Sequence, residues 1–77
     1  MKDIKRLSDI AIGGTAVVKE IKTCGSMHRR FLDIGLVNGT RVSCVGRSPL
    51  GDPSAYLIRG AVIAIRSDDS RNILVEA

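Results

Sequence analysis

The sequence predicts a mainly β fold, a small antiparallel barrel of about five strands with one α-helix. Three observations support this prediction. The chain has 77 residues, which is room for a single domain over residues 1–77. Its apolar stretches are short, rich in valine and isoleucine, and separated by Gly, Pro, Asn and Asp. Only one stretch has the spacing of an amphipathic helix.

The first elements are a lead-in and a strand. Residues 7–12 are expected to form one helical turn or an ordered lead-in, which Gly13 and Gly14 end. Residues 15–22 are rich in β-branched side chains, which pack well on a pleated surface. We therefore expect the first strand at residues 15–22.

The next segment changes period and predicts a helix over residues 26–34. Its apolar side chains recur at the spacing of one helix face: Met27, Phe31 and Ile34, with Leu32 beside them. Ser26 can cap the first turn by accepting a bond from an unpaired backbone N–H. Gly35 can take the left-handed conformation that ends a helix, and Leu36 can then close back on the apolar face.

Four more strands are expected after a turn at Asn38–Gly39, over residues 40–47, 54–59, 61–66 and 72–76. Val42 and Cys44 alternate with polar residues and are expected to point inward, so Cys44 acts as a small apolar side chain. Residues 67–70 form a turn or a single helical turn. Closely spaced strands pair antiparallel, and curling hides their edges. With one helix at an open end, this is the shape of an SH3-like barrel.

Five segments stand out: Leu7–Gly14, Arg29–Leu36 with Gly39–Val42, Pro49–Pro53, Ala61–Arg66 and Asn72–Glu76. Their order and spacing together resemble the ferrous iron transport protein A family. The resemblance extends over about residues 7–76. Asn38 stands where the family has proline, and asparagine also tolerates turn geometry.

The resemblance implies an SH3-like barrel that serves ferrous iron uptake as an accessory protein and not as an enzyme. Its implied partner is a membrane Fe(II) transporter with a guanine-nucleotide-binding domain, bound at its cytosolic portion and modulated by the binding. The residues agree with a non-catalytic role, because one histidine and no nucleophile–base–orienter set argue against acyl transfer. No apolar segment approaches the roughly 18 residues of a membrane span. A cytoplasmic location, with recruitment to the inner face of the membrane, is therefore expected.

The loop at residues 48–53 is the first candidate for partner binding. Two prolines and a glycine forbid a regular strand there and stiffen the loop, so less entropy is lost on docking. The candidate residues are Pro49, Leu50, Gly51 and Asp52. Leu50 either projects from the tip as a contact or folds back to cap the barrel.

Arg29 and Arg30 are the second candidate for partner binding. Both are expected to face outward from the helix, where the rigid fork of donors on arginine can grip acidic groups. The alternative is a solvated helix face, in which Arg29 and Asp33 pair weakly at i, i+4.

A metal-binding or iron-sensing module is the main alternative function. Cys24 and His28 are four residues apart and are weak candidates for a transition-metal site, although two ligands are too few to close a tetrahedral site. Apart from that metal, no cofactor is expected.

Nucleic-acid binding is a less favoured alternative, suggested by the net charge of +4. Only Phe31 and Tyr56 could stack on bases, and acidic residues interrupt the basic ones, so no nucleic-acid partner is expected. Exposed strand edges can pair two copies of a chain, so a homo-oligomer stays an alternative.

Overall fold

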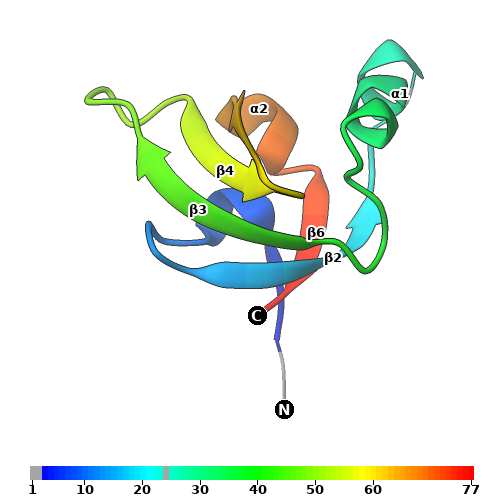
Figure 1. The fold of residues 1–77 in the computed structure, drawn as a ribbon, viewed down its shortest axis with the longest axis horizontal. Coiled ribbons are helices and arrows are strands. Elements are labelled where there is room, and N and C mark those ends of the chain that lie inside the picture. The colour runs from blue at the N-terminus through cyan, green and yellow to red at the C-terminus, as the bar shows by residue number, and fades with distance from the viewer. Residues whose placement is uncertain (1–2, 24) are drawn as a thin grey trace.

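The computed structural model describes residues 3–23 and 25–77. Its elements in chain order are β1 (Ile4–Arg6), a 3₁₀-helix (Leu7–Asp9), β2 (Thr15–Ile21), α1 (Gly25–Asp33), β3 (Arg41–Arg47), β4 (Ser54–Ile58), β5 (Ala61–Ile65), α2 (Ser67–Ser70) and β6 (Ile73–Glu76). Figure 1 shows the strands wrapped into one strongly curved sheet, with α1 beside it. The predicted class is therefore confirmed, as a small SH3-like antiparallel barrel with one main helix.

All the pairings in the sheet are antiparallel, and the strand order is β1-β6-β2-β3-β4-β5. Two irregularities bend it. The register shifts between Val18 and Glu20 on β2, and between Cys44 and Gly46 on β3. Because an extra residue on one strand increases the local twist, these two positions help the sheet to curl. The strands at the two ends of the order are β1 and β5.

The described residues contain six strands, so the expectation of about five missed β1. All three residues of β1 are exposed, and the segment has no alternating apolar pattern from which it could have been predicted. Its conformation comes from pairing with β6, in the register Ile4 with Glu76. Backbone bonds of 3.2 and 3.1 Å between Asp3 and Ala77 extend that pairing.

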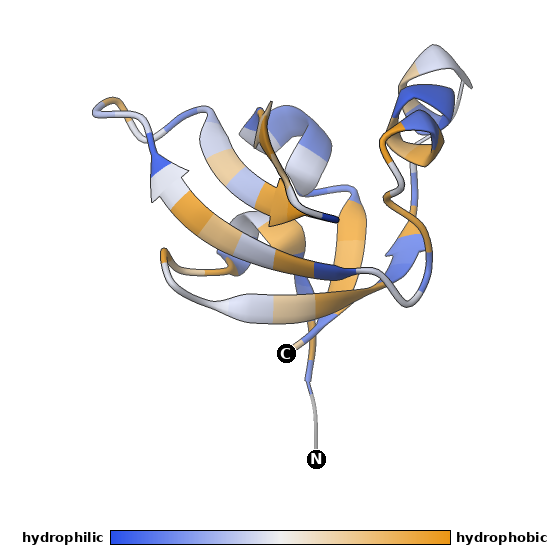
Figure 2. Cartoon of the chain, in the orientation of Figure 1, coloured by the Kyte–Doolittle hydropathy of each residue, from blue (hydrophilic) through white to orange (hydrophobic). Residues whose placement is uncertain are grey.

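The concave side of the sheet encloses an aliphatic core, and Figure 2 shows the apolar stretches gathered on the strands. The buried apolar residues are Leu7, Ile10, Ala16, Val18, Phe31, Leu36, Val42, Cys44, Tyr56, Ile58, Ile65, Ile73 and Val75. The inward positions predicted for Val42 and Cys44 are confirmed. Tyr56 is fully buried, and its hydroxyl donates to the carbonyl oxygen of Leu7 at 3.4 Å.

Helix α1 ends as predicted but begins differently. Gly35 has φ +88°, its N–H donates to Leu32 O at 3.0 Å, and the Leu36 N–H donates to Phe31 O at 2.9 Å. This pair of bonds is the Schellman motif, and buried Leu36 and Phe31 supply its apolar contact. The capping role predicted for Ser26 is wrong, because the helix already includes Gly25 and Ser26 lies inside its first turn.

The loop after α1 is held by a buried threonine. Thr40 Oγ1 donates to Gly35 O at 2.9 Å and accepts from the Val37 N–H at 3.1 Å. Thr40 also bonds to β2, where its carbonyl oxygen accepts from the Val18 N–H at 2.8 Å. These bonds fix the position of α1 relative to the sheet.

Candidate functional site

The loop at residues 48–53 presents an exposed leucine on a fixed backbone. Ser48 organises the turn: its N–H donates to Pro53 O at 3.0 Å, its Oγ donates to Asp52 O at 2.8 Å, and its carbonyl oxygen accepts from the Gly51 N–H at 2.8 Å. Leu50 is 95% exposed, so it does not fold back to cap the barrel. Pro49 and Gly51 are exposed beside it. The loop therefore presents one exposed apolar side chain on a backbone that hydrogen bonds hold in place.

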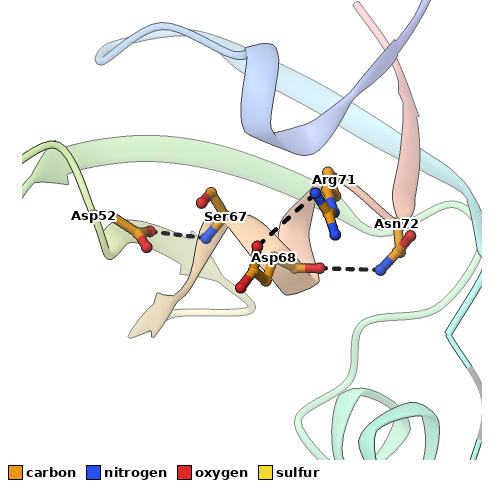
Figure 3. A network of polar contacts seen from close by, with 5 residues as sticks. All are labelled: Asp52, Ser67, Asp68, Arg71 and Asn72. Carbon is orange, nitrogen blue, oxygen red and sulfur yellow. Dashed lines mark hydrogen bonds and ion pairs between the residues drawn. The ribbon is translucent and has the colours of Figure 1, made fainter.

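Asp52, the fourth candidate residue of the loop, is engaged within the chain. Its Oδ1 accepts a hydrogen bond of 2.8 Å from the backbone N–H of Ser67, the first residue of α2 (Figure 3). The carboxylate therefore satisfies one of the unpaired donors at the start of that helix and ties the loop to it. Just after α2, Arg71 lies 3.9 Å from Asp68, and the Asn72 side chain donates to Asp68 O at 3.1 Å.

Arg29 and Arg30 are both exposed on α1, as predicted. The ion pairs within 4.0 Å in the described part of the chain are Lys19–Glu76 and Arg71–Asp68. The weak pair of Arg29 with Asp33, which belonged to the alternative of a solvated helix face, is not among them. Figure 1 shows α1 and the loop between β3 and β4 on opposite sides of the molecule, so the two predicted surfaces are separate.

The candidate metal pair Cys24 and His28 cannot be placed as a pair. Cys24 lies outside the described residues. The ring of His28 is engaged locally, with Nδ1 at 3.0 Å from the Thr23 carbonyl oxygen. Within residues 3–23 and 25–77, no three side chains of the metal-ligating types gather closely enough to hold an ion.

A third surface was missed from the sequence: a hollow of about 210 Å³ between α1 and β5. Its lining residues are Met27, Arg30, Phe31, Ile34, Ile63, Ala64, Ile65, Arg66 and Asp69. Met27 and Phe31 of α1, with Ile34 just after it, form an apolar face that the sheet covers only in part. The sequence signal that could have revealed this surface is the uncharged run of residues 61–65, which becomes informative once the strand is known to lie at an edge.

The described helices include none with the length and apolar character needed to cross a bilayer.

Comparison with known proteins gives a consistent result. A family model described as the FeoA domain matches residues 5–77. A curated relative, the Fe(2+) transport protein A/Fe(2+) transporter FeoB fusion protein of Porphyromonas gingivalis, is 34% identical over 71 residues, which cover 92% of this chain. The chain spans only 8% of the length of that relative.

Two solved structures share the fold. The FeoA-like protein of Clostridium acetobutylicum is 31% identical, with a TM-score of 0.88 over 100% of this chain and 90% of that one. The zinc complex of FeoA from Stenotrophomonas maltophilia, described as an SH3 domain protein, is 24% identical, with a TM-score of 0.79 over 97% and 88% of the two chains. The second likeness concerns the fold alone.

Proposed function

The chain belongs to the FeoA domain family, and from this membership we propose that it is a non-catalytic accessory protein of ferrous iron uptake. In this proposal it binds the cytosolic portion of a membrane Fe(II) transporter that carries a guanine-nucleotide-binding domain, and it modulates transport. The protein then acts at the cytoplasmic face of the membrane.

The observation that carries the proposal is the fusion protein of Porphyromonas gingivalis. In that relative, a segment 34% identical to this chain is joined to an Fe(2+) transporter. Joining two modules in one chain raises the concentration of each near the other, which is useful where the modules work in contact. The same association between separate chains is the simplest function for this domain.

Two surfaces are proposed to contact the transporter. The first is the tip of the 48–53 loop, where Leu50 is 95% exposed and can be buried against an apolar site. The second is the exposed pair Arg29 and Arg30 on α1, whose guanidinium groups suit carboxylates on the partner. The bond from Asp52 to α2 supports the loop, so Asp52 contributes by holding the loop in place.

The proposal is tested by calorimetry with the ferrous transporter from the same organism, purified whole in lipid nanodiscs, with and without guanine nucleotide. We expect saturable binding to wild-type protein. Leu50→Ala is expected to weaken binding by about tenfold or more, because the buried part of a leucine contributes about 1.5–3 kcal/mol. Replacement of both Arg29 and Arg30 by alanine is expected to weaken it and to reduce its dependence on salt.

The matched control is Ile4→Ala, which removes an exposed apolar side chain of β1 outside both proposed surfaces. It should bind the transporter like the wild type. Absence of binding by the wild-type protein in every nucleotide state would refute the proposed function. Binding that is unchanged in the loop and arginine variants would refute the two surfaces but leave the function standing.

A further inference from the structure

The end strand β5 carries none of the residues that usually protect a sheet edge. It pairs with β4 on one side, and the sheet order leaves its other side without a strand in the described part of the chain. Its sequence, Ala61-Val62-Ile63-Ala64-Ile65, contains no charge, proline or glycine. Natural proteins blunt exposed edges with short strands, charges, proline or bulges, because an open edge is a template for another strand.

The opposite end of the sheet illustrates the contrast. Strand β1 has three residues, and two of them are Lys5 and Arg6. Its edge is therefore short and charged. Strand β5 has five residues, of which Ala61, Val62 and Ala64 are exposed, Val62 to 64%. One edge of the molecule is protected and the other is open.

The hollow described above borders this end strand. Successive residues of a strand point to opposite faces, and Ile63 and Ile65, on the core-facing side, both line the hollow. Ala64 lines it as well, so the hollow reaches β5 itself between them. Across it lie Met27 and Phe31 of α1, with Ile34 just after the helix.

Basic side chains stand at both ends of this strand. Arg59 precedes β5 in the turn from β4, and Arg66 follows it and lines the hollow. Arg30 lines the same hollow from α1. None of the three belongs to an ion pair within 4.0 Å among the described residues. Asp69 is the single acidic residue of the lining.

Arg59 is held at its end of the strand by an unusual backbone. It is the one described non-glycine residue with positive φ, at +50°, a conformation that costs roughly 1 kcal/mol or more for such a side chain. Its side chain runs across Gly35, where a Cβ would collide with the Arg59 Cδ. The fold thus directs an arginine to the gap between the β4–β5 turn and the end of α1.

We propose that the β5 edge and the adjoining hollow receive an extended segment of the partner, which adds to the sheet as a further strand. The segment is apolar at alternate residues and carries acidic residues at both ends. Main-chain hydrogen bonds to β5 supply affinity, and the hollow and the arginines select the sequence. The identity of the partner, the cytosolic portion of the transporter, rests on the function proposed above.

Charge selects this occupant over a second copy of the chain. Symmetric antiparallel pairing of two β5 strands about Ile63 brings Arg66 of one copy beside the Arg59–Gly60 turn of the other. Like charges opposite one another on neighbouring strands are destabilising. An acidic segment of a partner meets the same arginines with favourable pairs at both ends.

The first test uses synthetic peptides and the full chain, observed by hydrogen exchange in NMR spectra. The probe peptide has an alternating valine–threonine centre as long as β5, with two glutamates at each end. One control peptide replaces the glutamates with lysines, and another carries a proline at the centre, which removes a main-chain donor. We expect the acidic peptide alone to slow exchange of β5 amides. Protection elsewhere, or no binding of the acidic peptide, would overturn the strand addition.

The second test uses the whole transporter in nanodiscs and a matched pair of variants. Val62→Asp puts a negative charge on the end strand, while Val45→Asp makes the same change at an exposed valine of β3, which β4 separates from β5. We expect Val62→Asp to weaken binding at least tenfold, which corresponds to about 1.4 kcal/mol, and Val45→Asp to change it by less than about twofold. The melting temperature of each variant reports whether it is folded.

The outcomes separate the two proposals. Equal binding by Val62→Asp and the wild type would overturn the use of the β5 edge, while the function proposed above would stand. Failure of the wild-type protein to bind the transporter would overturn that function, and the peptide test would still decide whether the edge accepts an acidic strand.

Discussion

Two leucines of this chain have opposite environments and allow a contact role to be separated from a structural one. Leu50 is 95% exposed and Leu36 is fully buried. Leu50→Ala is expected to change the free energy of unfolding by less than about 0.5 kcal/mol, because it removes no buried contact. Leu36→Ala is expected to cost about 2–5 kcal/mol through lost burial and a cavity. Urea denaturation of both variants checks this. A large loss of stability in Leu50→Ala would mean that the loop leucine is structural.

Glycine at position 35 satisfies two independent requirements, and Gly39 satisfies one of them. Both have positive φ, +88° and +94°, but only Gly35 is crossed by the Arg59 side chain, while a Cβ at Gly39 meets nothing within 4 Å. We expect Gly39→Ala to cost about 1–2 kcal/mol, the penalty of the left-handed conformation. Gly35→Ala should cost measurably more, since Arg59 must also move.

Thermal and urea unfolding of the two glycine variants provide the measurement. Equal destabilisation would show that the contact between Arg59 and Gly35 contributes nothing to stability. A smaller cost for Gly35→Ala than for Gly39→Ala would contradict the structure at this position.

Among single residues, the features that the sequence predicted correctly are those determined by neighbouring residues in the chain. The exposure of Arg29 and Arg30, the inward direction of Cys44 and the terminating role of Gly35 all follow from period and backbone preference. The bond from Asp52 to Ser67 joins residues 15 positions apart and has no local signature. The side chain of Arg59 against Gly35 likewise required the hairpin and the helix to be positioned first.

The short helix α2 depends on a residue from another element. Asp52 Oδ1 accepts from the Ser67 N–H at 2.8 Å, and Arg66, at the N-cap position, makes no side-chain capping bond (Figure 3). Asp52→Ala is expected to cost about 0.5–2 kcal/mol, the range for loss of an N-cap acceptor. Asp52→Asn keeps an acceptor oxygen and should lose less.

Urea denaturation measures both Asp52 variants, and amide exchange in α2 reports the local effect. If Asp52→Ala were as stable as the wild type and α2 exchanged at the same rate, the bond would have no part in fixing the loop. The order of the two variants is the critical outcome, because both remove the charge but only one removes the acceptor.

Helix α1 is expected to be less stable than the central strand β3. It has nine residues, fewer than the roughly 12–15 at which an isolated helix becomes marginal, and Phe31 is its one buried side chain. Strand β3, in contrast, is hydrogen-bonded to β2 on one side and β4 on the other. Native-state hydrogen exchange should therefore show faster exchange for α1 amides than for β3 amides. Exchange of α1 as slow as that of β3 would contradict this reading of the packing.

Among the elements, those with longer periodic segments were predicted better from the sequence. The helix, the loop at residues 48–53 and the longer strands each carry several residues of pattern, and their bounds were predicted to within about two residues. Strand β1 has three exposed residues and exists because β6 offers it an edge. The open edge of β5 could not be predicted either, because an uncharged run of five residues looks the same in a central strand and in an end strand.

For the whole molecule, the location of charge matters more than its total. The net charge is +4, but the arginines that bear on assembly are the two that bracket β5, Arg59 and Arg66. In a symmetric antiparallel pairing of two copies, each end of the new ladder brings these two arginines together. The β5 edge can therefore accept a strand of another protein, whereas like charges disfavour its pairing with the β5 edge of a second copy.

This arrangement predicts that one substitution makes the edge self-complementary. Arg59→Glu places a negative charge at one end of β5 and leaves Arg66 at the other, so antiparallel pairing of two copies now joins opposite charges at both ends. Each such pair contributes roughly 0.2–1 kcal/mol, and the like-charge repulsion is removed as well. Sedimentation equilibrium at low salt should show Arg59→Glu dimerising about tenfold or more tightly than the wild type.

Arg29→Glu is the matched control, because it makes the same change in net charge at an exposed position of α1 that does not line the hollow beside β5. It should sediment like the wild type. Added salt should weaken the Arg59→Glu dimer, since exposed pairs are screened. If Arg59→Glu and Arg29→Glu behaved alike, the charges at the ends of β5 would not control pairing there, and they would not select an acidic partner over a second copy.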